Sequence, residues 1–145
     1  MKALVSPQKK AEWKINKQEF ILELQEKYNV IELNEITDIK RHYCYEWTIK
    51  EDNHFIDGML DNTLNCVCID TDSIGLCCSF ALWVRTFMPD NADIMLYDED
   101  FINHIYLKKD TDIPTHIYIH RYLFNKVLGR ARWLTPVIPA LWEAE

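Results

Sequence analysis

The spacing of apolar residues predicts an amphipathic helix near the start of the chain. In "NKQEFILELQEKYNV", Phe20, Leu24 and Tyr28 recur every four residues, and charged residues occupy the opposite side. This period places the three apolar side chains along one stripe of a helix. Asn16 precedes the pattern and Glu19 follows three residues later, which is the arrangement of a capping box. We therefore predict a helix of about three turns that begins after Asn16.

A period of two predicts strands in two later regions. "RHYCYEWTI" alternates aromatic or aliphatic residues with polar ones, as a strand with one buried face does. "FIDGML" and "TLNCVCI" flank Asp61–Asn62, which suits a hairpin connection. "DIMLYDED" and "FINHIYLKK" form a further pair joined by an acidic turn. We therefore expect about five antiparallel strands.

The segment "DSIGLCCSFALWVRTFMPD" predicts a buried helix between these two groups of strands. Arg85 is its only charged residue between Ile74 and Met88, and Pro89 ends the pattern. The segment is too short to cross a bilayer, so we expect it to be a central helix on which the sheet packs.

Three residues of this helix have predicted structural roles. Phe80 and Trp83 should fill the core between helix and sheet. A charge on a buried helix needs a partner, so Arg85 should pair with a carboxylate, with Glu46 and Asp98 as candidates.

These elements predict the fold class and the domain organisation. "TDIPTHIYIHRYLFNKVL" resumes a helical pattern, with Pro114 in its first turn. The expected fold is α+β: an antiparallel sheet of about five strands packed on a buried central helix, with flanking N- and C-terminal helices. Residues 1–14 are expected to form a loose leader, residues 15–128 a single domain and residues 129–145 an appended tail.

Charge narrows the class of partner. The 145-residue chain has a net charge of −7; residues 1–14 carry +3 and residues 129–145 carry none, which leaves −10 for residues 15–128. Such a body repels nucleic acid and favours a basic protein partner. With 3 glycines and no glycine-rich phosphate loop, the chain suggests no nucleotide cofactor of the familiar loop-bound kind, and we expect no cofactor.

The five cysteines allow a structural and two chemical interpretations. The N-terminus lacks an apolar signal segment, so we expect a cytoplasmic protein with no membrane segment and reduced, buried thiols. Two alternatives stay open. Cys66, Cys68, Cys77 and Cys78 could bind zinc, although no CxxC pair is present. Cys77 could be a nucleophile near a helix start, with His42 or His54 as its base.

A second metal candidate lies in the predicted C-terminal helix. Asp112, His116 and His120 follow one another at four-residue spacing and would share one face of that helix. The motif lacks the glutamate of HExxH and a third distant ligand, so a pair of surface histidines is the competing interpretation.

Acidic turns supply the candidate partner-binding residues. The predicted rim charges and a predicted aromatic anchor are Asp57, Asp61, Asp98, Glu99, Asp100 and Trp47. Carboxylates at a rim steer a basic partner, and a tryptophan in the centre of an interface supplies affinity.

Two stretches resemble known sequences. "RWLTPVIPALWEAE", with Pro136 and Pro139 three residues apart, resembles the conceptual translation of the primate Alu repeat. That resemblance implies that residues 129–145 are an exonised segment or part of a chimera. "GLCCSFALWVRTFMPDNADIMLYDED" together with "TDIP", from about Gly75 to Pro114, resembles small acidic bacterial proteins of unassigned, immunity or accessory type. This second resemblance transfers no active-site residue.

Three functional hypotheses follow. The first is a non-enzymatic acidic module that binds a basic protein, with a toxin-neutralising immunity protein as its concrete version. The second is a small enzyme or ligand-binding domain with a pocket between the sheet and the buried helix. The third is a structural subunit that self-associates through an edge strand.

Overall fold

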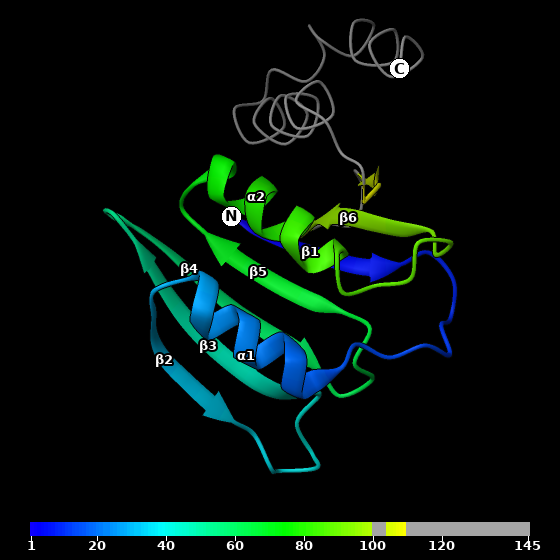
Figure 1. Cartoon of the computed structure of the whole chain (residues 1–145), viewed down its shortest axis with the longest axis horizontal. Coiled ribbons are helices and arrows are strands. Elements are labelled where there is room, and N and C mark those ends of the chain that lie inside the picture. The colour runs from blue at the N-terminus through cyan, green and yellow to red at the C-terminus, as the bar shows by residue number, and fades with distance from the viewer. Residues whose placement is uncertain (100–103, 110–145) are drawn as a thin grey trace, which may run out of the picture. The chain divides into compact units, whose positions relative to one another are not determined.

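A seven-stranded antiparallel sheet organises the part of the chain that the structure describes (Figure 1). In this computed structural model, residues 1–99 and 104–109 are described. The strand order is β2-β3-β4-β5-β1-β6-β7. The strands are β1 (Lys2–Pro7), β2 (Val30–Glu35), β3 (Tyr43–Glu51), β4 (His54–Asp61), β5 (Val67–Thr71), β6 (Ile94–Asp98) and β7 (His104–Leu107).

Two short helices lie on the same face of this sheet (Figure 1). Helix α1 (Lys17–Lys27) begins at Asn16, whose Oδ1 accepts a hydrogen bond from the backbone N of Glu19 at 3.1 Å. Helix α2 (Ile74–Arg85) begins at Ser73, whose Oγ accepts from the backbone N of Leu76 at 3.3 Å. Both caps satisfy an amide that the first helical turn leaves without a partner.

The core lies between the helices and the sheet. Alternate residues of the strands point toward the helices and are buried, as Ile56, Gly58 and Leu60 are in β4. Trp47 in β3 packs its ring against Phe20 of α1, with ring centroids 5.6 Å apart. Further aromatic contacts join the two helices in the same layer, through Phe20, Tyr28, Phe80, Trp83 and Phe87.

The predicted α+β class is wrong, because the described chain is mainly β. It has seven strands where about five were expected, and its helices are short. The two additional strands are β1 and β2. Strand β2 lies at the edge of the sheet and carries Glu32 and Glu35, which makes its alternation weak. Charged residues of this kind are typical of edge strands.

The expectation of a loose leader over residues 1–14 is also wrong. Strand β1 pairs with β5 on one side and with β6 on the other. Ala3 and Val5 are buried, while Lys2, Leu4 and Ser6 alternate with them. The strand has only 6 residues and is followed by the polar stretch Gln8, Lys9 and Lys10. Its alternation is therefore too short to distinguish a strand from a loop in the sequence.

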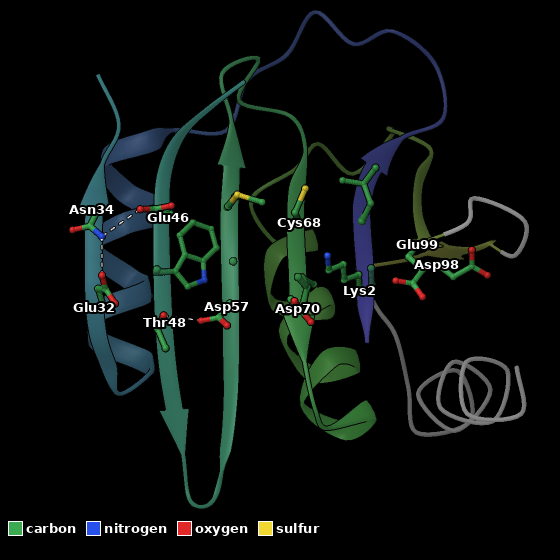
Figure 2. Close-up of a pocket in the computed structure, with 16 residues that line it drawn as sticks. Lys2, Glu32, Asn34, Glu46, Thr48, Asp57, Cys68, Asp70, Asp98 and Glu99 are labelled. Carbon is green, nitrogen blue, oxygen red and sulfur yellow. Dashed lines mark hydrogen bonds between the residues drawn. The ribbon is translucent and has the colours of Figure 1, made fainter. Parts of the chain in front are cut away.

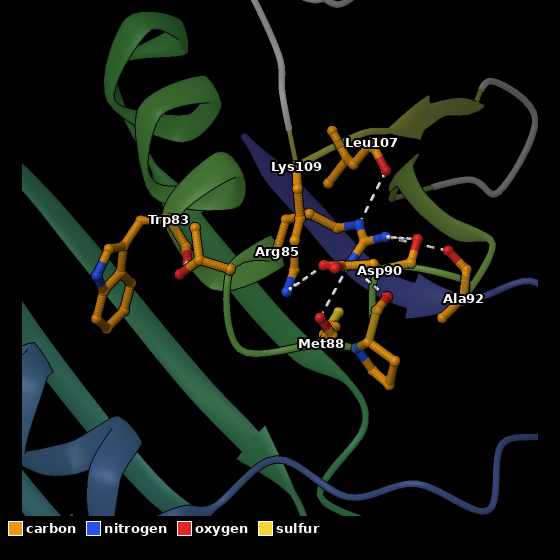
Figure 3. A network of polar contacts seen from close by, with 9 residues as sticks. Trp83, Arg85, Met88, Asp90, Ala92, Leu107 and Lys109 are labelled. Atoms are coloured by element: carbon orange, nitrogen blue, oxygen red, sulfur yellow. Dashed lines mark hydrogen bonds and ion pairs between the residues drawn. The ribbon is translucent and has the colours of Figure 1, made fainter.

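The predicted partner of Arg85 is corrected by the structure. The side chain is 2% exposed, yet among the described residues no carboxylate forms a salt bridge with it. Its guanidinium instead donates to backbone carbonyls (Figure 3). The acceptors are Leu107 at 2.9 Å, Met88 at 3.2 Å, Pro89 at 3.0 Å, Asp90 at 3.4 Å and Ala92 at 3.1 Å.

These five bonds match the five N–H donors of a guanidinium. Burial lowers the pKa of Arg85, and the nearby carboxylates of Asp90 and Asp93 oppose that shift. The Asp90 carboxylate itself pairs with Lys109 at 2.7 Å (Figure 3). Arg85 therefore holds together the end of α2, the following loop and β7.

Several predictions fall on residues outside the described ranges. They are the C-terminal helix, the tail 129–145, the metal candidates Asp112, His116 and His120, and the rim residue Asp100. Neither helix of the described ranges has the length and apolarity that a bilayer crossing requires.

Candidate functional site: an acidic hollow on the open face of the sheet

The sheet face opposite the two helices carries an open hollow of about 560 Å³. Figure 2 views this face, with the helices behind the sheet. The hollow extends across β2, β3, β4, β5 and β1 and reaches the end of β6. The residues that line it by side chain or backbone are Lys2, Ala3, Leu4, Glu32, Asn34, Glu46, Trp47, Thr48, Asp57, Gly58, Met59, Cys68, Ile69, Asp70, Asp98 and Glu99.

The pleat of the strands places polar side chains in this hollow. Trp47 and Ile49 face the helices, so Glu46 and Thr48, which alternate with them, face the open side. Asp57 lies directly opposite Thr48 on the neighbouring strand. The Thr48 hydroxyl donates to the Asp57 carboxylate at 2.6 Å (Figure 2).

A similar arrangement joins β2 to β3. Asn34 lies opposite Glu46, and its amide nitrogen donates to that carboxylate at 3.4 Å and to Glu32 at 3.1 Å (Figure 2). The hydrogen bonds hold these two carboxylates beside each other on the open face. They use only part of the acceptor capacity of each carboxylate, because an ionised carboxyl group has about four lone-pair sites.

The charge of the hollow is strongly negative. Among the described residues that line it, the acidic ones are Glu32, Glu46, Asp57, Asp70, Asp98 and Glu99, and the basic one is Lys2. The amino group of Met1 lies 3.6 Å from Asp70 and offsets part of that charge. Carboxylates on the strands β2 to β5 therefore face solvent together on one surface.

Apolar side chains line part of the hollow and form its floor. Leu4, Met59 and Cys68 point to the open side and are half-buried. Burial raises the pKa of the Cys68 thiol, and the neighbouring Cys66 and Asp61 raise it further, so Cys68 is neutral at physiological pH. The floor can thus contact aliphatic parts of a ligand while the carboxylates contact its charges.

Some of the predicted rim residues line the acidic hollow, and one of them does not. Asp57 and Glu99 are exposed and line the hollow. Asp98 also lines it but is only 5% exposed. Asp61 does not line it; its carboxylate accepts from the backbone N of Thr63 at 3.0 Å and stabilises the turn after β4.

Trp47 is not the exposed anchor that the sequence suggested. Its side chain is 2% exposed and belongs to the core, where it touches the aromatic rings of both helices. Strand alternation places a residue on one face without saying which face is open, so the sequence pattern alone could not settle this.

Sequence reasoning missed Glu32 and Glu46 as members of this surface. Glu46 could have been found, because it shares a face with Thr48 in the alternating pattern of "RHYCYEWTI". Glu32 comes near it only through the strand order, in which β2 flanks the β3–β4 hairpin.

The thiol hypotheses gain no support from the geometry. Burial raises the pKa of both Cys77 and Cys78 to about 12, so neither thiol forms a nucleophilic thiolate at neutral pH. Both side chains are fully buried in α2. Within the described ranges, no three His, Cys, Asp or Glu side chains come together as a metal site.

Comparisons with known proteins identify no family. No family model matches the chain, and no solved structure matches it. A stretch of 18 residues is 83% identical to part of the human "Uncharacterized protein ZNF561-AS1". The match covers 12% of this chain and 17% of that protein, and it indicates that the chain contains a primate repeat-derived segment. No match supports the resemblance of Gly75–Pro114 to bacterial immunity or accessory proteins.

Proposed function

We propose that the chain is a non-enzymatic protein-binding module whose acidic hollow binds a basic segment of a protein partner. The observation that supports this proposal is the set of carboxylates on the open sheet face, with Lys2 as the basic residue among the described lining residues. The described thiols near the hollow are neutral, and they supply no nucleophile there.

The geometry suits lysine and arginine side chains. Neighbouring strands lie about 4.8 Å apart, so carboxylates on adjacent strands form a closely spaced array. An extended basic segment could place its charged ends on Glu46, Asp57 and Asp70. Its aliphatic stems would then contact Leu4 and Met59.

Such an interface depends on long-range attraction. Carboxylates at a binding surface increase the association rate with a basic partner, and salt screens this effect. A toxin-neutralising immunity protein is one class of protein that would use an acidic surface in this way. A reducing cytoplasm would keep the five thiols free, as they are in the structure.

Binding of a lysine- and arginine-rich peptide tests the proposal. We expect the dissociation constant to rise steeply when the salt concentration is raised from about 0.05 M to about 0.3 M. A variant with Glu46→Gln, Asp57→Asn and Asp70→Asn should bind the peptide at least about tenfold more weakly. These substitutions keep the size of each side chain and remove only the charge.

A matched variant removes three carboxylates that do not line the hollow, through Glu12→Gln, Glu26→Gln and Asp52→Asn. Asp52 has a positive φ of 54°, and asparagine adopts that conformation readily. This variant has the same net charge as the first and should retain most of the affinity. Equal weakening in both variants would show that net charge alone attracts the peptide, and the proposed site would then be wrong.

A further inference from the structure

A second cavity, of about 490 Å³, lies where the end of β1 meets the turn between β4 and β5. It is formed by the segment that follows β1 and by that turn. The residues that line it are Ser6, Pro7, Gln8, Lys9, Lys10, Ala11, Trp13, Lys14, Thr63, Asn65 and Cys66. Its volume is within the range of small-molecule binding sites.

The charge of this cavity is opposite to that of the acidic hollow. Lys9, Lys10 and Lys14 are among its lining residues, and no described residue that lines the cavity carries a carboxylate. None of these lysines forms a salt bridge within the described ranges. In a chain whose acidic residues outnumber its basic ones by 23 to 16, this local excess of positive charge is distinctive.

Polar side chains from β1 and from the turn after β4 line the same cavity. The Ser6 hydroxyl and the Cys66 thiol share a hydrogen bond of 3.1 Å. The Thr63 hydroxyl donates to Asp61 at 2.5 Å and also lies 2.8 Å from the side-chain oxygen of Asn65. The Ser6 hydroxyl can reorient to donate to a bound oxyanion, whereas the Asp61 carboxylate holds the single proton of the Thr63 hydroxyl.

Trp13 adds an aromatic surface to the same cavity. Its side chain is half-buried, in contrast to the buried Trp47 and Trp83. A partly exposed indole can stack on a planar ring of a ligand. Such stacking stabilises binding to any nucleobase, because every base has a π-face. A ligand with both an anionic part and a planar ring would use the lysines and Trp13 together.

We propose that this cavity binds a small phosphate-bearing molecule with a planar ring, of the nucleoside polyphosphate class. Three lysines among the lining residues of one cavity suit a multiply charged anion, and lysine is a common ligand of phosphate. The proposal is independent of the proposed function, because the lysines belong to a different cavity from the acidic hollow.

Titration calorimetry of the full chain with ATP, in the presence of EDTA, tests the proposal. Tripolyphosphate and adenosine separate the two parts of the ligand. We expect ATP to bind, tripolyphosphate to bind more weakly and adenosine to bind weakly or not at all. Absence of ATP binding, or adenosine binding as tight as that of ATP, would overturn the proposal.

Matched charge variants locate the site. Lys9→Gln, Lys10→Gln and Lys14→Gln together should weaken ATP binding by roughly tenfold. The control combines Lys27→Gln, Lys40→Gln and Lys50→Gln, which are exposed and do not line the cavity. It should change the affinity much less, and a loss as large as that of the first variant would show a nonspecific charge effect and refute the site.

Alkylation of the thiols supplies a second readout that does not depend on folding of a variant. Cys66 lines the cavity and Cys44 does not. Bound ATP should slow the reaction of Cys66 with iodoacetamide, measured by peptide mass spectrometry, and leave the rate at Cys44 unchanged. Equal rates at Cys66 with and without saturating ATP would contradict the placement of the ligand.

Discussion

Replacing Gly58 by alanine tests how tightly the core between sheet and helices is packed. Gly58 in β4 lies opposite Trp47 in β3. A Cβ added at Gly58 would lie no more than 2.6 Å from three atoms of the Trp47 indole ring. Such a contact is far shorter than van der Waals distance, so the ring or the strand would have to move.

The indole ring has little room to move. Its centroid is 5.6 Å from that of Phe20 and 6.2 Å from that of Phe80, so helices α1 and α2 both confine it. Its buried N–H has no hydrogen-bond partner among the described residues. Overpacking of a filled core costs about 1–3 kcal/mol.

The expected change in the free energy of unfolding has the opposite sign to that of most glycine-to-alanine substitutions. At an unhindered site, replacing glycine by alanine stabilises a protein by about 0.4–1 kcal/mol, because the unfolded chain loses conformational freedom. We expect Gly58→Ala to lower the free energy of unfolding by about 2 kcal/mol. Urea unfolding followed by far-UV circular dichroism measures this change.

Two further variants identify the cause. Gly75→Ala in α2 is the matched control, because its new Cβ would meet only the Ser73 hydroxyl, at 3.9 Å; it should raise stability by up to about 1 kcal/mol. In a Trp47→Leu background, Gly58→Ala should lose most of its cost, with a coupling energy of about 1 kcal/mol or more. A Gly58→Ala protein as stable as the parent, or an equal cost in both backgrounds, would refute the reasoning.

Three other predictions concern buried polar groups. Arg85→Met should lower the free energy of unfolding in urea by about 3–5 kcal/mol, because five backbone carbonyls lose their donor; a loss below about 1 kcal/mol would contradict the network. Cys77 and Cys78 should resist iodoacetamide in the native protein at pH 8 and react only in urea, since burial raises the pKa of both to about 12; rapid native labelling would place them at the surface. Burial also raises the pKa of Tyr28 to about 12. These folded pKa values exceed the unfolded ones, so their contribution to stability is complete below about pH 9 and is lost as the pH rises toward 12. Urea midpoints measured from pH 8 to pH 11 should therefore fall, and a flat profile would be inconsistent with burial of these groups.

Local signals in the sequence predicted local structure well. The capping box at Asn16 and Glu19 predicted the start of α1, and the apolar run closed by Pro89 predicted α2. The alternation around Trp47 predicted β3. In each of these cases, the residues that determine the element lie within a few positions of one another.

Non-local pairing accounts for what the sequence could not predict. Strand β1 was missed because its six residues gain their order from β5 and β6. The partners of Arg85 are backbone carbonyls, which any residue type supplies, so no residue pattern marks them. Asp57 and Glu99 were identified as candidate partner-binding residues, but Glu32, which lines the same hollow, could be found only once the strand order was known.

The position of β1 has a consequence for how the chain reaches its native state. Lys2 pairs with Asp70, and Ala3 pairs with both Ile69 and Asp98, so this interior strand of the sheet is synthesised long before its two neighbours. On the ribosome, this segment has to wait with both of its edges unpaired until most of the described chain has emerged. Contacts of such long range slow folding, and they make the waiting strand a natural target for a chaperone.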